Sequence, residues 1–179
     1  MLEAMPIRRV GPEYADEAVS ILREAAAWAL GRGVDVWRLD QLLEQDFREA
    51  ALRGELVMGF RGSHPAVTML LQSSDPIYWP EIPRGTSLFL HKIAVRRACA
   101  GQGWLGRLID FAAQNAQQRD IAWLRLDTLH GSPLRQLYEA HGFTAIEEPP
   151  LMHLGRAMLR MQRLLGRDGA RNTVRESPD

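Results

Sequence analysis

Residues 95–110 read VRRACAGQGWLGRLID and carry an apolar strand through a glycine-rich turn into a helix. Gly101, Gly103 and Gly106 have no side chains, so a ligand can closely approach the backbone of the turn. The N-terminus of a helix offers unpaired N–H groups and a partial positive charge, which together favour a diphosphate. Arginines beside the turn could add charge-assisted contacts, namely Arg96, Arg97 and Arg107. The stretch therefore predicts a phosphate-binding turn; a helix start that needs glycines only for its own geometry is the alternative.

The segments around this turn alternate between the periods of strands and helices. Apolar residues at three- and four-residue spacing predict helices over 12–30, 38–51, 103–118 and 132–141. Two-residue alternation bounded by turn residues predicts strands over 6–10, 55–60, 65–72, 87–95, 122–127 and 142–147. Residues 151–165 fit a strand in their first half, with a helix as an alternative for the second half.

This order of elements predicts one mixed α/β domain over residues 1–165, in which a meander of strands leads into βαβ units. The tail, residues 166–179, lacks apolar periodicity and is predicted to be disordered.

The composition argues against several classes of function. The chain has 179 residues and a formal net charge of zero, so no overall field attracts it to nucleic acid or anionic lipid. Cys99 is the only cysteine, which excludes an internal disulfide and a cysteine-rich zinc site. The five histidines lie far apart, so no metal is expected. With neither a signal peptide nor an apolar run of bilayer length, we expect a cytoplasmic protein without nucleic-acid or membrane partners.

Two classes of ligand compete for the glycine-rich turn. Residues 101–106 spell G-x-G-x-x-G, and Asp127 ends a strand about twenty residues later, where a dinucleotide site holds its ribose. However, five residues separate Val95, which ends the apolar strand, from Gly101, and two of them are charged. Only about fifty residues follow Asp127, too few for the rest of a doubly wound sheet. A nucleotide-binding oxidoreductase is therefore the less favoured alternative.

Two motifs favour acetyl-CoA instead. Residues 93–95 (IAV) end the strand and residues 101–103 (GQG) form the turn, so the stretch resembles motif A (Q/R-x-x-G-x-G/A) of the GCN5-related N-acetyltransferase superfamily. Residues 132–143, SPLRQLYEAHGF, resemble the second signature of the superfamily, a tyrosine followed four residues later by Gly-Phe. The similarity extends over most of residues 5–148. It has two departures: Ala100, where Arg or Gln is usual, and Leu105, where Gly or Ala is usual.

The resemblance implies a central, mostly antiparallel sheet with splayed middle strands and helices on both faces. It also implies direct transfer of an acetyl group from acetyl-CoA to a primary amine of a small molecule or to a peptide N-terminus. Tyr138 would protonate the leaving thiolate, although it also lies on an apolar stripe typical of a core position. Many relatives form homodimers, and we expect the same here. Because of the two departures, a non-catalytic CoA-sensing module on the same fold stays an alternative.

The same resemblance assigns a set of positions to acetyl-CoA, through the end of the strand, the turn and the later helix. They are Ile93, Ala94, Val95, Arg96, Gly101, Gln102, Gly103, Trp104, Leu105, Gly106, Arg107, Ser132, Arg135 and Tyr138.

His91 is the candidate base on the acceptor side. Strand alternation places it on one face with Phe89, Ile93 and Val95. Arylalkylamine N-acetyltransferases resemble this strand and use a histidine there to remove a proton. An imidazole suits that role because its ordinary pKa is near neutral; a half-buried histidine bonded to a neighbour is an equal alternative.

The first two helices and the loop over residues 73–86 are expected to select the acceptor. The expected acceptor-binding residues are Trp37, Asp75 and Trp79, with Trp28, Tyr78 and Glu81 as further candidates. Core tryptophans and solvated loop acids are the ordinary alternative. The acceptor class stays open among polyamines, aminoglycosides, arylalkylamines, amino acids and protein N-termini.

Overall fold

The computed structural model describes residues 5–146 and 149–166. Within them one sheet has the strand order β1-β2-β3-β4-β5-β8-β6, and β7 pairs with β8. The strands are β1 (Ile7–Arg9), β2 (Leu56–Arg61), β3 (His64–Gln72), β4 (Ser87–Val95), β5 (Trp123–Leu129), β6 (Thr144–Ala145), β7 (Leu151–His153) and β8 (Arg156–Leu164). The predicted disordered tail, apart from Gly166, lies outside the described residues.

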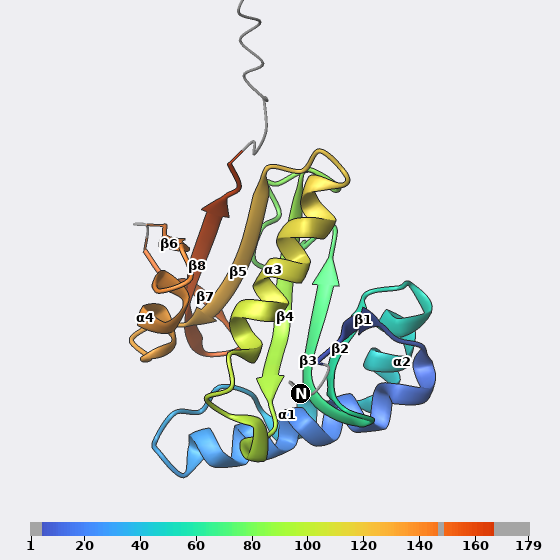
Figure 1. The fold of residues 1–179 in the computed structure, drawn as a ribbon. Coiled ribbons are helices and arrows are strands. Elements are labelled where there is room, and N and C mark those ends of the chain that lie inside the picture. The colour runs from blue at the N-terminus through green and yellow to red at the C-terminus, as the bar shows by residue number, and fades with distance from the viewer. Residues whose placement is uncertain (1–4, 147–148, 167–179) are drawn as a thin grey trace, which may run out of the picture.

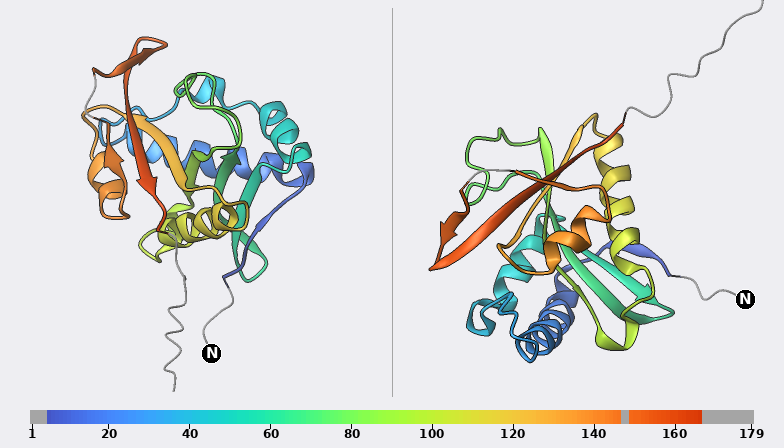
Figure 2. Two further views of the ribbon diagram at one scale, coloured as in Figure 1. Left: turned by 90° about the horizontal axis from the view of Figure 1, so that it is seen from above. Right: turned by 90° about the vertical axis from the view of Figure 1, so that its left-hand side faces the viewer.

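Helices cover both faces of this sheet (Figures 1 and 2). They are α1 (Ala15–Leu30), α2 (Glu44–Leu52), α3 (Trp104–Gln117) and α4 (Leu134–Glu139), with short 3-10 turns at Pro12–Tyr14, Leu39–Gln41 and Arg97–Cys99. One apolar cluster joins α1 and α2 to the sheet, through residues such as Ile21, Phe47 and Met58. A second cluster joins α3 to the opposite face, through residues such as Leu108 and Leu126. We call these two sides the α1 face and the α3 face.

The observed architecture confirms the predicted fold class. Neighbouring strands are antiparallel except for β4 and β5, which are parallel and joined by α3 in a βαβ unit. Residues 151–165 form a hairpin of β7 and β8, so the helix alternative for their second half is wrong. The reason is that β8 pairs with β5 from Met158 to Leu164, and a paired strand satisfies its backbone across the sheet.

The second predicted helix starts later than the sequence pattern indicates. Residues 38–51 were expected to be helical, but α2 begins at Glu44, after a 3-10 turn and a non-helical Leu42. Leu39 and Leu43 are 43% and 53% exposed, so they do not belong to the buried stripe. Leu42 is buried without helical geometry, which explains why apolar spacing alone extended the helix too far.

Strands β4 and β5 pair over only part of their length. The ladder runs from Ser87–Trp123 to Phe89–Arg125, and the strands then diverge toward the C-terminal end of β4 (Figure 1). The predicted splay is therefore present. Beyond Phe89, the edge of β4 that faces β5 has no strand partner among the described residues.

Strand β4 also carries a bulge that reverses the faces of its side chains. Opposite β3, His91 pairs with Leu70 and Ala94 pairs with Thr68, so β4 has one residue more than β3 between these pairs. Lys92 lies in this bulge with a φ of 52°. His91 therefore shares the α1 face with Leu70, as paired residues do.

The two residues after the bulge point the other way. Ile93 and Val95 pack against the cluster of the α3 face. The expectation that His91 shares one face with Ile93 and Val95 is wrong, because it assumed unbroken alternation through Lys92.

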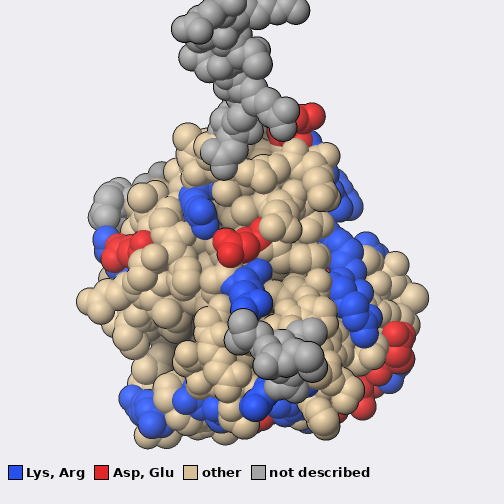
Figure 3. Space-filling view, viewed as in Figure 1, with Lys and Arg blue, Asp and Glu red and all other residues tan. Residues whose placement is uncertain are grey.

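The surface seen from the α3 face has no single-sign charge field. Basic and acidic side chains lie scattered between broad areas of other residues (Figure 3). This distribution agrees with the formal net charge of zero.

Candidate active site

A cavity of about 700 Å³ lies where β4 and β5 diverge. Its walls come from the end of α1 and the segment after it, the loop after β3, the open half of β4, the end of β5, and α4. Cavities of this size are typical of small-molecule sites. The splay of the sheet therefore positions the site.

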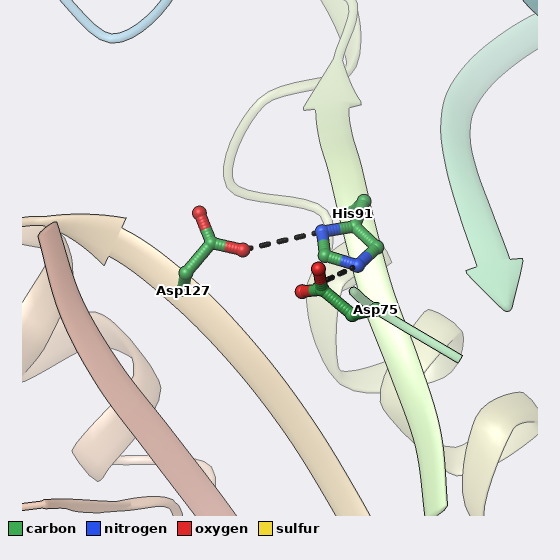
Figure 4. Close-up of side chains that lie close together, drawn as sticks. All are labelled: Asp75, His91 and Asp127. Atoms are coloured by element: carbon green, nitrogen blue, oxygen red, sulfur yellow. Dashed lines mark ion pairs between the residues drawn. The ribbon is translucent and has the colours of Figure 1, made fainter. Parts of the chain in front are cut away.

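Three polar side chains meet at one wall of the cavity, from three separate elements (Figure 4). The Nδ1 atom of His91 on β4 lies 3.2 Å from Oδ1 of Asp127 on β5. Its Nε2 atom lies 3.4 Å from Oδ2 of Asp75 in the loop after β3. The imidazole ring thus has a carboxylate at each of its two nitrogen atoms.

Local backbone contacts fix Asp75 in this position. Its Oδ1 atom accepts hydrogen bonds from the backbone N–H groups of Ile77 (3.0 Å) and Tyr78 (2.9 Å), which form a tight turn. Its Oδ2 atom, like Oδ1 of Asp127, is buried and has no hydrogen-bond partner within the described residues. A buried carboxylate oxygen without a donor is costly, and the facing ring nitrogen of His91 is the donor available to each of them.

The two carboxylates control the charge of His91. Burial lowers the pKa of the imidazole, but the contact with Asp127 and the negative charges of Asp127 and Asp75 more than offset it. The pKa of His91 therefore lies above its ordinary value of 6.5. The imidazolium form persists to higher pH than in a free histidine.

Tyr138 on α4 lines the same cavity and contacts Phe143 edge to face, with ring centroids 6.0 Å apart. Burial raises the pKa of its hydroxyl well above the ordinary value, and the charge of Asp127 raises it further. The hydroxyl is therefore protonated at neutral pH and available as a hydrogen-bond donor.

The glycine-rich turn is open where it leads into α3. Gly101 and Gly103 both have a φ of 76°, and a Cβ added to either would meet nothing within 4 Å. These two glycines are thus required by backbone conformation, and they leave space above the N-terminus of α3. Gly106 differs, because a Cβ there would lie 3.3 Å from Cε1 of His141. It allows α3 to approach the segment after α4.

Comparison with known proteins identifies the fold. No family model matches the chain. It is 28% identical to YesJ, an uncharacterized N-acetyltransferase of Bacillus subtilis (strain 168), over 141 residues that cover 73% of this chain and 77% of the relative. The fold matches a GNAT-family acetyltransferase of Listeria monocytogenes with a TM-score of 0.71, at 18% identity over 90% of this chain and 95% of that one. It also matches the PaiA N-acetyltransferase of Thermoplasma acidophilum in complex with coenzyme A, with a TM-score of 0.72, at 12% identity over 90% and 99% of the two chains.

This chain has the fold of GNAT-family (GCN5-related) N-acetyltransferases, and its sequence is similar to that of an N-acetyltransferase. The resemblance seen in the sequence is thereby confirmed. The dinucleotide alternative for residues 101–106 is not supported, since the sheet is mostly antiparallel rather than doubly wound. Asp127, which that alternative assigned to a ribose, faces His91 instead.

The structure places the residues expected at the acetyl-CoA site in three different settings. Ile93, Ala94, Val95, Leu105 and Tyr138 line the cavity. Gly101, Gln102, Gly103 and Arg107 lie exposed around the open turn. Trp104 is 1% exposed and packs against Gly59, so it belongs to the core.

Several polar side chains expected to bind acetyl-CoA have partners within the chain. Arg96 pairs with Glu17 and Glu24 of α1, the latter at 3.0 Å. The hydroxyl of Ser132 donates to the backbone oxygen of Leu129 (2.7 Å), and Arg135 pairs with Glu139 (2.7 Å). These contacts tie the turn to α1 and stabilise α4.

The expected acceptor-binding residues are divided as well. Trp37 and Asp75 line the cavity, as do Trp28 and Tyr78. Trp79 is 1% exposed and lies between Phe89 and Arg125, beneath the site rather than at its wall. Glu81 pairs with Arg160 (2.6 Å).

Two residues of the site were missed from the sequence. Asp127 was considered only for a ribose, although alternation along β5 places it on the same face as Arg125, which pairs with Phe89. Lys92 gave no signal beyond being the only lysine of the chain.

None of the helices in residues 5–146 and 149–166 combines the length and the apolar character that crossing a bilayer requires.

Proposed function

We propose that this chain transfers the acetyl group of acetyl-CoA directly to a primary amine of a small molecule or a peptide N-terminus. The observation that carries the proposal is His91, held between two carboxylates at the wall of a cavity that opens between β4 and β5. The similarity to N-acetyltransferases, one of them solved with coenzyme A, supports the reaction class and the cofactor.

The residues present fit acetyl-CoA. The open N-terminus of α3, with Gly101 and Gly103 free of side chains, suits the diphosphate. The edge of β4 beyond Phe89 offers unpaired backbone groups, from Ile93 to Val95, to a pantetheine arm. Bound there, acetyl-CoA supplies an activated acetyl thioester.

The acceptor amine is proposed to bind beside the edge of His91 that faces Asp75. When the ring is neutral and donates its Nδ1 proton to Asp127, Nε2 is an acceptor close to the negative charge of Asp75. A cationic ammonium suits this place, because it donates to Nε2 and is attracted to the charge of Asp75. Its proton then passes to Nε2, and Asp127 stabilises the imidazolium that forms. The product is the neutral amine that the reaction needs.

Tyr138 is proposed to act on the other side of the reaction. Its hydroxyl stays protonated because burial raises its pKa. A phenol with a raised pKa releases its proton reluctantly, so its main contribution is a hydrogen bond to the charge developing on the leaving thiolate, with proton transfer completing the step.

The test combines binding with turnover. Wild-type protein is expected to bind acetyl-CoA in calorimetry and to release thiol in the presence of an amine acceptor. Tyr138→Phe keeps acetyl-CoA binding but lowers kcat by about 10²–10⁴-fold, as expected for loss of a general acid. Tyr14→Phe is the matched control, because Tyr14 packs against Phe60, away from the cavity. Unchanged turnover in Tyr138→Phe would favour the CoA-sensing alternative, and binding of NAD rather than acetyl-CoA would refute the proposal.

Cytoplasmic residence and a homodimer are two further parts of this proposal. The absence of a membrane-crossing helix in the described residues agrees with the first. Cell fractionation tests the location, and sedimentation velocity at several concentrations tests for a dimer.

A further inference from the structure

Lys92 occupies an unusual place at the wall of the cavity. It is the only lysine of the chain and follows His91 directly. Its φ of 52° is left-handed, which side chains other than glycine rarely adopt. Strain of this kind persists where the surrounding structure enforces it and is concentrated at functional sites. The bulge in β4 thus holds a single, partly buried ammonium group beside the proposed base.

This ammonium group has no partner in the described part of the chain: no hydrogen bond or ion pair joins Lys92 to another residue there. Burial lowers the pKa of Lys92, whereas the more distant carboxylates of Asp127 and Asp46 raise it. Neither carboxylate forms an ion pair with this ammonium. A partly buried cation without a counter-ion is costly, and an anionic group of a ligand would offset that cost.

Most other charges at the cavity wall are already engaged. Arg53 pairs with Glu55 (3.0 Å), Arg156 pairs with Asp35, and the Arg97 guanidinium lies 3.7 Å from the ring centroid of Trp28. Two other cations at the wall have no hydrogen bond or ion pair among the described residues, Arg84 and Lys92. Arg84 is exposed, whereas Lys92 is partly buried and directly follows His91.

We propose that Lys92 binds a carboxylate of the acceptor, and that the acceptor is therefore an amino acid. Its ammonium binds beside His91, close to the negative charge of Asp75, and its carboxylate pairs with Lys92. His91 and Lys92 are consecutive and both line the cavity, so one small ligand with an ammonium and a carboxylate is the class that we assign to them. The aromatic wall of Trp28, Trp37 and Tyr78 suits an apolar side chain. This inference rests on the proposed function and names its substrate class.

The experiment compares apolar L-amino acids with their primary amides, which keep the amine and lose the negative charge. Thiol release from acetyl-CoA gives kcat and KM for each member of a pair. Wild-type protein is expected to prefer the amino acid over its amide. In Lys92→Gln this preference, as a ratio of kcat/KM values, falls about 10- to 100-fold, the range expected for loss of a charge-assisted hydrogen bond. Lys92→Arg retains most of it, because the positive charge remains.

Two controls separate a local effect from a general one. Arg119→Gln removes a positive charge from an exposed position outside the cavity and keeps the wild-type ratio. Calorimetry with acetyl-CoA measures whether Lys92→Gln has damaged the cofactor site instead. If it has, the amino acid and its amide lose activity equally, and the inference is overturned.

Three other results would also overturn it. A wild-type enzyme that acetylates amides as well as amino acids would have no carboxylate site, while the proposed function would stand. A gain of one acetyl group by the protein itself, absent in Lys92→Arg, would show that Lys92 is a neutral nucleophile rather than an anion-binding cation. A wild-type protein that binds acetyl-CoA but is inactive with every amine would refute both the inference and the proposed function.

Discussion

The two halves of β4 have the same backbone direction and opposite roles. Residues 87–90 are buried, and Ser87 to Phe89 pair with β5. There the guanidinium of Arg125 bonds to the hydroxyl of Ser87, so even the polar groups are satisfied. Residues 91–95 have no pairing with β5, contain the bulge, and carry two titratable groups of the cavity, His91 and Lys92. The chemistry of this strand begins where its pairing to β5 ends, because only there do polar groups lack partners within the fold.

The strongest test of this contrast is His91→Gln, in the open half. Gln keeps a polar side chain of similar reach but cannot accept and release a proton at neutral pH. We expect kcat/KM to fall by about 10²–10⁴-fold with little change in the acetyl-CoA dissociation constant. Steady-state kinetics and calorimetry measure the two quantities. Full activity in His91→Gln would assign proton removal to another group.

Leu88→Ala tests the paired half. Leu88 is 1% exposed within the cluster of the α3 face, and its truncation is expected to lower the free energy of unfolding by about 2–5 kcal/mol. The folded fraction should keep its kcat, because Leu88 does not line the cavity. Denaturant unfolding measures the free energy of unfolding. Leu164→Ala is the control, because Leu164 is 60% exposed and its substitution should change this free energy by nearly zero. A lower kcat in the folded fraction of Leu88→Ala would contradict the division of β4 into a structural half and a functional half.

Gly103→Ala and Gly106→Ala sharpen the comparison at the turn that follows β4. An alanine at position 103 meets no atom but must adopt a φ of 76°, at a cost of about 1–2 kcal/mol. We expect a loss of stability of that size, or a rearranged turn that weakens acetyl-CoA binding about tenfold. Gly106→Ala has an allowed φ and must only displace His141 slightly, so its effect should be smaller. Equal effects would mean that the open turn has no role in binding.

The smallest expected effect is the change of stability and of kcat/KM with pH. The folded-state pKa of His91 is raised above 6.5, so its ion pairs contribute stability that is fully present below pH 6.5 and is lost as the pH rises through the folded pKa. Over the same interval kcat/KM should rise, because only the neutral ring accepts a proton. Thermal unfolding and kinetics from pH 6 upward measure both, and His91→Gln should remove the stability trend. A profile centred below 6.5 would contradict the role of the two carboxylates.

Local patterns in the sequence predicted most of the fold. The apolar spacing of α1 and α3 and the alternation of β2, β3 and β5 are properties of single segments, which a sequence displays directly. The bulge at Lys92 is different, because it exists only relative to β3 and leaves no local signal. The late start of α2 was missed for a similar reason, since Leu42 is buried by tertiary packing rather than by helical geometry.

The site was predicted in part. His91, Asp75 and Tyr138 were named from the sequence and do line one cavity, whereas their roles stay predictions. The contact between His91 and Asp127 joins two strands separated by a helix, so no spacing rule indicates it. Trp79 was expected at the cavity as an aromatic residue of the loop over residues 73–86, but it packs beneath the site.

The extra residue in β4 makes the length of this strand as important as its composition. One residue more on β4 than on β3 turns His91 toward the α1 face and Ile93 toward the α3 face, so a single strand serves as a shared wall between two compartments. Inserting one residue into β3 opposite the bulge, between Thr68 and Leu70, would restore one-to-one pairing and exchange the sides of the β4 residues beyond it. Most surface loops tolerate insertions and deletions, but here a change of one residue in length would invert the site while leaving nearly every amino acid in place.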